Sequence, residues 1–140
     1  MSPGSTRTGG VLEDMVLPAL RLGGYDFQVQ TKVGKRLGLG AHKVDCIASK
    51  DGRSVLVSVK WQQVSGTAEQ KVPFEVICLL DALDANPETY VKAYVVLGGE
   101  GWKLRGFYTS GGLAKYLSYT DRIEIVSLEG FVARANQGRL

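Results

Sequence analysis

The stretch Lys43-Val-Asp-Cys-Ile-Ala-Ser-Lys-Asp-Gly-Arg-Ser-Val-Leu-Val-Ser-Val-Lys60 decides the fold, because it has the pattern of two alternating strands joined by a tight turn. Asp51-Gly52 between two β-rich runs is a strong hairpin signal, since both turn residues need a positive φ angle. A two-residue loop there places Asp45 opposite Ser58 and puts Lys60 diagonally across on the same face, about 7–8 Å away. We therefore expect a carboxylate, a hydroxyl and an ammonium to project together from one face of a sheet.

The alternate residues of the second strand are apolar: Val55, Val57 and Val59. This face of the strand is predicted to be core, because alternation places every second residue on the same side of a sheet. Two interpretations of Asp45 and Lys60 remain at this point. They form either a buried structural salt bridge or part of a catalytic site, and the elements around the hairpin bear on the choice.

Periodicity predicts further elements on both sides of the hairpin. Helices are predicted over residues 11–22, 66–83, 110–119 and 129–137, and strands over residues 25–33, 90–97 and 122–128. Pro18 should kink or shorten the first helix, and Pro73 suggests that the regular part of the second begins only near Val72. Its apolar side is predicted to contain Val76, Ile77, Leu80 and Leu83. Residues 1–10 are expected to form a flexible arm and residues 11–140 a single domain.

Composition excludes several classes of protein. With 140 residues, 44% hydrophobic and 22% charged, the chain is typical of a globular domain, and its net charge of +3 permits nucleic-acid binding without requiring it. Cys46 and Cys78 lie in apolar runs and are expected to be reduced core residues of a cytoplasmic protein. One His and two Cys exclude a zinc finger. No run approaches ~20 apolar residues, so we expect no membrane partner.

The order helix, strand, hairpin, helix, strand, with Asp45 on one strand and Ser58-Val59-Lys60 on the next, resembles the PD-(D/E)XK nuclease superfamily. The resemblance covers residues 11–97 and implies an α/β fold, a mixed central sheet flanked by helices with an α-β-β-β-α-β restriction-endonuclease-like core. It also implies a Mg²⁺-dependent (or Mn²⁺-dependent) DNA endonuclease of the small phage, mobile-element, resolvase or restriction type. An enzyme this small that cuts both strands of DNA is expected to act as a homodimer.

Two positions depart from the family motif: Val44 stands where proline is usual, and Ser58 stands where the family carries an acid. One branch of restriction endonucleases has Ser-x-Lys here and takes a glutamate from the following helix. Glu69 is our first candidate for that acid and Glu75 the alternative. If neither acts, the chain would be a catalytically inactive nuclease-fold module for DNA binding or assembly.

The resemblance also assigns roles to single residues. Asp45 would be the central metal ligand, with Glu69 beside it and Glu13 assisting from the first helix. Lys60 would orient or deprotonate the attacking water, or neutralise charge in the transition state. Gln62 would position water or phosphate, or else cap the strand end. The candidates for contacts with DNA phosphates are basic residues near loops: Lys35, Arg36, Lys43, Lys71, Lys103 and Arg105.

Overall fold

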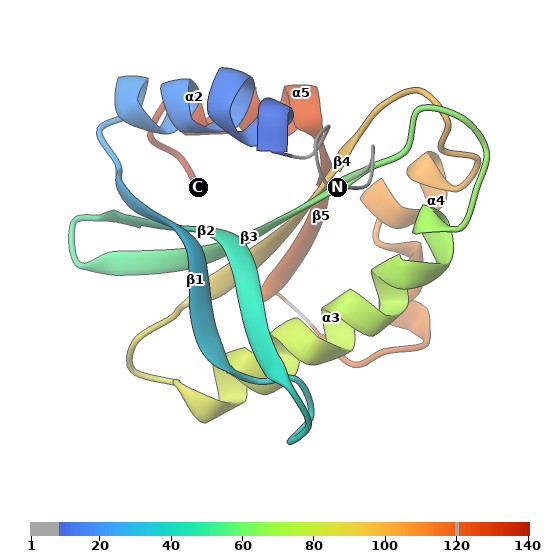
Figure 1. The fold of residues 1–140 in the computed structure, drawn as a ribbon, viewed down its shortest axis with the longest axis horizontal. Helices are drawn as coiled ribbons and strands as arrows, with labels where there is room; N and C mark the ends of the chain where they lie inside the picture. The colour runs from blue at the N-terminus through green and yellow to red at the C-terminus, as the bar shows by residue number, and fades with distance from the viewer. Residues whose placement is uncertain (1–8, 120) are drawn as a thin grey trace.

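The computed structural model describes residues 9–119 and 121–140, so residues 1–8 of the expected arm lie outside the described part. These residues form one five-stranded sheet in the order β1-β2-β3-β4-β5 with helices on both faces. In Figure 1, α2 and α5 lie on one side of the sheet and α3 on the other. The architecture confirms the predicted α/β class with a mixed, helix-flanked sheet.

The first helical segment contains the irregularity that Pro18 predicts. It runs through a π-helix, η1 (Leu12–Val16), into α2 (Leu17–Leu22). The Leu17 N–H donates to the Leu12 carbonyl, five residues back, so the helix is widened just before the proline. A proline lacks an N–H and its ring clashes with the carbonyl four residues earlier. The wider turn accommodates this ring, and α2 then ends at Leu22, as predicted, with Gly23 as its C-cap.

The next three strands form the antiparallel part of the sheet: β1 (Asp26–Lys35), β2 (Ala41–Lys50) and β3 (Arg53–Trp61). Asp51 and Gly52 have φ angles of 53° and 78°, so the predicted turn is present. Pairing runs from Lys50 opposite Arg53 to Cys46 opposite Val57, which is the predicted register. The side chains of the predicted apolar face of β3 are buried in the core cluster under α2 and α5.

Both β1 and β2 bend sharply in the middle (Figure 1). Gln30 has a φ of 48°, and the pairing of β1 with β2 omits it, passing from Val29–Cys46 to Thr31–Val44. Beyond the bend, residues 31–44 leave the neighbourhood of β3 and fold over α3, where Val33 and Val44 join its core cluster. We call residues 31–44 the outer arm. The sequence did not predict this bend.

The long helix α3 (Ala68–Ala85) connects β3 to β4 (Lys92–Gly98), and these two strands are parallel. The prediction that regular helix begins near Val72 is wrong, because α3 begins at Ala68 and contains Pro73. Proline leaves the carbonyl of Glu69, four residues earlier, without its helical donor. The Tyr108 hydroxyl donates to that carbonyl over 2.7 Å and replaces the missing bond.

The buried side of α3 also differs from the prediction. It contains Val72, Val76, Leu79 and Leu83, whereas Ile77 is 38% exposed. Residues three or four apart from Val72 onward form the row that faces the sheet. Ile77 lies beside that row and therefore points outward.

After β4 come α4 (Arg105–Thr109), the 3-10 helix η2 (Gly112–Lys115), β5 (Ile123–Ser127) and α5 (Leu128–Asn136). The single helix predicted over residues 110–119 is wrong, because Gly111 has a φ of 82° and separates α4 from η2. The strand and terminal helix predicted next are present, and β5 pairs parallel to β4. None of the helices in the described part is long and apolar enough to cross a membrane. Both cysteines are buried and free, as predicted.

Candidate active site around Glu75

A single buried carboxylate, that of Glu75 on α3, collects polar side chains from several elements. Its Oε2 accepts a hydrogen bond from Ser58 Oγ at 2.8 Å and pairs with Lys60 Nζ at 2.9 Å. Its Oε1 lies 3.2 Å from His42 Nε2 and 3.6 Å from an Arg36 nitrogen. Strand β3 and the outer arm therefore meet α3 at this residue.

These donors decide the charge of Glu75. Burial alone would raise its pKa, because a carboxylate loses hydration in the interior. The hydrogen bonds from His42, Lys60 and Ser58, with the charge of Lys60, outweigh burial and hold the pKa of Glu75 well below its ordinary value. The carboxylate is therefore ionised at neutral pH. Since it can only accept, the imidazole nitrogen that faces it carries the hydrogen.

Asp45 lies at the bend of β2, where β2 and β3 separate. Its Oδ2 accepts the backbone N–H of Val59 at 2.6 Å, and its Oδ1 lies 3.5 Å from the Gln30 amide nitrogen. Burial raises the pKa of Asp45, the Val59 bond and the charge of Lys60 lower it, and the charge of Glu75 raises it. Asp45 is thus close enough to Lys60 and Glu75 for both charges to affect its pKa.

Two candidate acids follow Lys60 in the sequence, and Glu75 is the one that lies beside Ser58. Glu69 lies at the start of α3, where its Oε1 accepts the Leu104 N–H at 2.7 Å and its carbonyl binds Tyr108. Glu69 therefore ties α3 to the N-terminal end of α4.

Glu75 forms a group with Arg36, His42, Asp45, Ser58 and Lys60, which we call the Glu75 cluster. Two other candidate residues lie outside it. Glu13 is exposed on η1, in the helical layer on the opposite side of the sheet from α3. Gln62 is buried at the end of β3, where its Oε1 accepts the Ala68 N–H at 3.0 Å and its Nε2 donates to Gly101 at 2.8 Å. Gln62 therefore caps α3 and holds the loop after β4.

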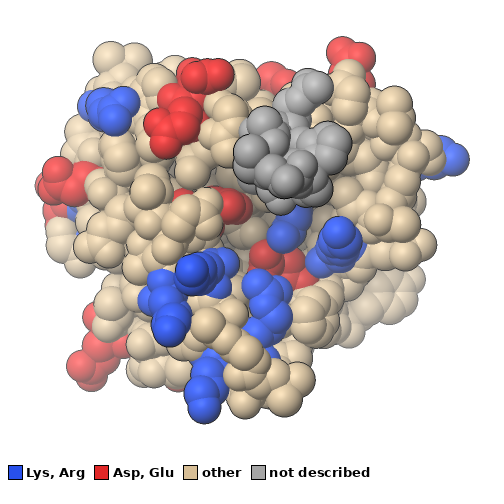
Figure 2. Space-filling model, viewed as in Figure 1, with Lys and Arg blue, Asp and Glu red and all other residues tan. Residues whose placement is uncertain are grey.

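Five of the six basic candidates fall into two groups. Lys35, Arg36 and Lys43 lie on the outer arm, and Figure 2 shows Lys and Arg side chains gathered over the face where β1, β2 and their turn lie. Lys71 is exposed near the start of α3. The second group, Lys103 and Arg105, follows β4, and Arg105 donates to the Gly99 carbonyl.

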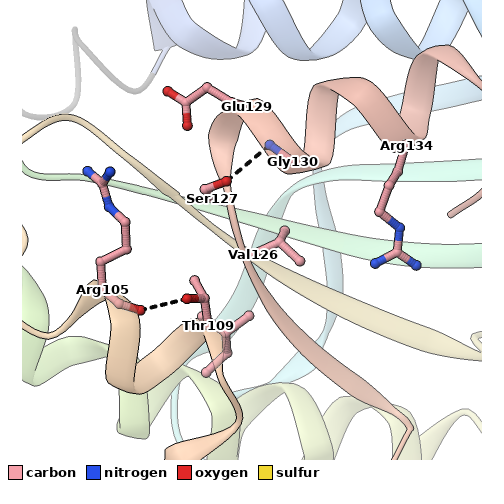
Figure 3. Close-up of a pocket in the computed structure, with 8 residues that line it drawn as sticks. Arg105, Thr109, Val126, Ser127, Glu129, Gly130 and Arg134 are labelled. Atoms are coloured by element: carbon pink, nitrogen blue, oxygen red, sulfur yellow. Dashed lines mark hydrogen bonds between the residues drawn. The ribbon is translucent and has the colours of Figure 1, made fainter.

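Arg105 also lines a cavity of about 410 Å³ between α4, β5 and α5. In Figure 3, Arg105 and Thr109 form one side, and Ser127, Glu129 and Arg134 lie across from them. The Ser127 hydroxyl already has a hydrogen-bond partner, because it accepts the Gly130 N–H as the N-cap of α5. None of the residues that line this cavity belongs to the Glu75 cluster.

The Glu75 cluster has the chemistry of a divalent cation site, although it is not a complete one. Asp45 and Glu75 supply the carboxylate oxygens that Mg²⁺ prefers, and the pKa of Asp45 is raised chiefly by burial, with a smaller contribution from the charge of Glu75 that a cation would offset. Within residues 9–119 and 121–140, however, no group of three or more His, Cys, Asp or Glu is placed to hold a metal. Waters and substrate oxygens would have to complete the coordination, which is the usual situation for Mg²⁺.

Comparison with known proteins bears on the family and on the fold. A family model described as PD-(D/E)XK nuclease superfamily domain matches residues 4–139. A crystal structure titled as a protein of unknown function, AF1548, superposes with a TM-score of 0.53 and 11% identity, and the match covers 80% of this chain and 54% of that one. At that identity the likeness shows the fold alone. No curated protein matches the sequence.

Proposed function

Because this chain belongs to the PD-(D/E)XK nuclease superfamily, we propose that it is a Mg²⁺- or Mn²⁺-dependent endonuclease that hydrolyses phosphodiester bonds in DNA. The observation that carries the proposal is the position of Glu75, which brings a carboxylate to Ser58 and Lys60 beside Asp45. This chain has Ser58 where the family motif carries an acid, and Glu75 occupies the space next to that hydroxyl. It is therefore the residue best placed to supply the missing carboxylate.

The residues of the Glu75 cluster would have separate roles in the hydrolysis of a phosphodiester bond. Asp45 and Glu75 would hold the cation, which supplies Lewis acidity and a more acidic water when bound. Lys60 would orient the attacking water or balance charge on the phosphate, since its ammonium already lies 2.9 Å from the Glu75 carboxylate and is only partly exposed. The buried donors Ser58 and His42 keep Glu75 ionised and fix the direction of its carboxylate.

A second candidate function is a nuclease-fold module that binds DNA without cutting it. One observation favours it: both oxygens of Glu75 already accept donors from protein side chains. A cation would have to displace one of these donors before Glu75 could bind it.

The deciding experiment incubates purified protein with supercoiled, branched and single-stranded DNA, with Mg²⁺, with Mn²⁺ and with chelator. We expect cleavage of at least one substrate only when the cation is present. Asp45→Asn should abolish cleavage while the circular dichroism spectrum stays unchanged, and Glu88→Gln, a change at an exposed turn residue, serves as the matched control. Binding of DNA without cleavage under every condition would favour the inactive module instead.

A further inference from the structure

We propose that the tip of the outer arm, residues 36–40, enters a groove of duplex DNA and presses Leu37 and Leu39 against the bases. This inference rests on the proposed function and deepens it, because it names duplex DNA as the substrate class and identifies the segment that distorts it. Each part of the inference comes from the exposure, charge and position of the outer arm.

The two leucines are presented to solvent on an ordered turn. Leu39 is 79% exposed and Leu37 is 44% exposed. The turn is closed by the Arg36 N–H, which donates to the Gly40 carbonyl at 2.8 Å, and by the Leu39 N–H, which donates to the Arg36 carbonyl at 3.0 Å. Leucine is one of the apolar residues that proteins insert between base steps in the minor groove.

The surroundings of these leucines are basic. The outer arm has no Asp or Glu, and Lys32, Lys35 and Lys43 are exposed on it. Figure 2 shows how Lys and Arg side chains gather over this part of the surface. Positive charge around an apolar tip suits the phosphates on both sides of a DNA groove, because phosphate contacts need charge and little else.

The tip is also attached directly to the proposed active site. Arg36, the first residue of the tip, and His42, on β2 just after the tip, both contact Glu75. Since a strand advances about 3.3 Å per residue, Leu39 lies within roughly 10 Å of either residue along the chain. A duplex with a phosphate at Glu75 and Asp45 therefore passes under the tip, which projects past α3 in Figure 1. The major groove of B-DNA is wide enough to admit a two-stranded β-ribbon.

The test uses the double variant Leu37→Ala/Leu39→Ala, with Leu22→Ala as matched control, because Leu22 is 74% exposed at the end of α2 on the other side of the sheet. Binding to a duplex that contains 2-aminopurine is followed with Ca²⁺ in place of Mg²⁺. Wild type and Leu22→Ala should raise the 2-aminopurine fluorescence as the base unstacks. The double variant should lose this rise and bind the intact duplex roughly tenfold more weakly.

A duplex with a central unpaired bulge should restore much of the affinity of the double variant, because the unstacking cost is already removed. If the double variant kept the fluorescence rise and the affinity of wild type, the proposal that the two leucines act as a wedge would be overturned. Tight binding by wild type with no fluorescence change would also overturn it. Mg²⁺-dependent cleavage of DNA by wild type keeps the two proposals apart, since the wedge can fail while that cleavage persists. Absence of any DNA binding by wild type would overturn both the wedge and the proposed function.

Discussion

Glu75 is a buried charge whose environment is arranged to keep it charged. Four side chains that can donate to it surround its carboxylate: Arg36, His42, Ser58 and Lys60. Such a carboxylate couples the stability of the fold to pH, because it binds a proton less readily in the folded protein than in the unfolded chain.

The pH dependence has a definite sign. The folded-state pKa of Glu75 is lowered from 4.5, so the unfolded chain takes up a proton first as the pH falls. The stabilisation from Glu75 is therefore complete above pH 4.5 and is lost as the pH falls below that value. Glu75→Gln should cost about 2 kcal/mol at neutral pH and should flatten the acid side of the stability curve. Urea unfolding across this range measures both, and an equally steep acid limb in the variant would contradict the account.

Asp45 offers a second prediction, which concerns its own pKa. After burial, the charge of Glu75 is one of the influences that raise the pKa of Asp45, whereas Lys60 lowers it. Glu75→Gln removes the negative neighbour and leaves Lys60 free to interact with Asp45. The pKa of Asp45 should therefore fall in this variant, and a carbon-detected NMR titration of the carboxyl groups would follow it. An unchanged pKa of Asp45 in the variant would mean that the two acids do not interact.

At the scale of single residues, the sequence predicted one half of the Glu75 cluster. Counting from Asp51-Gly52 was sufficient to pair Cys46 with Val57 and to bring Asp45 near Lys60, because a two-residue turn defines the register of its hairpin. The choice between Glu69 and Glu75 was a different problem. It depends on which turns of α3 face β3, and Pro73 suggested a helix start four residues too late. Glu69 lies in the first turn and meets α4, whereas Glu75 lies further along and meets β3.

At the scale of elements, two close contacts hold the helices in place, and each yields a stability prediction. The first joins α2 to α5. A Cβ atom built on Gly23 would lie 1.8 Å from the Ala135 carbonyl oxygen, which is far inside van der Waals contact. The φ of Gly23 is −80°, so any residue could adopt this backbone and the constraint is purely one of space.

Gly23→Ala should therefore destabilise the protein by about 3 kcal/mol or more, because the two helices must separate. Gly106→Ala is the control: it lies in α4, where a Cβ atom added to the glycine would have no neighbouring atom within 4 Å, and it should be neutral or slightly stabilising. Thermal unfolding of the two variants gives the comparison. Equal melting temperatures would show that α2 and α5 are free to move apart.

The second contact joins α4 to α3 through Tyr108. Its hydroxyl satisfies the Glu69 carbonyl that Pro73 leaves without a donor. Tyr108→Phe should cost about 1–2 kcal/mol, since it leaves a buried carbonyl unpaired. Urea denaturation measures the loss, with Tyr116→Phe as control at a tyrosine that is 75% exposed. No difference between the two variants would mean that this carbonyl does not need the hydroxyl.

For the molecule as a whole, the order of the core elements followed from periodicity, but the path of the first hairpin did not. Alternation over residues 25–33 predicts a straight strand, whereas Gln30 takes a left-handed conformation that non-glycine residues rarely adopt. This bend turns the outer arm over α3 and brings Arg36 and His42 to Glu75. Sequence patterns describe local backbone preference, so they cannot show a bend that tertiary contacts impose.

The central claim is that Glu75 replaces the acid missing at Ser58. It is tested most directly by Mg²⁺-dependent cleavage rates of Glu75→Gln, Glu69→Gln, the exposed control Glu88→Gln and the double variant Ser58→Glu/Glu75→Gln, measured on one DNA substrate. We predict that Glu75→Gln lowers the rate by about a hundredfold or more, that Glu88→Gln cleaves like wild type, and that the double variant regains part of the activity. Wild-type cleavage by Glu75→Gln, or loss of cleavage in Glu69→Gln alone, would contradict the claim.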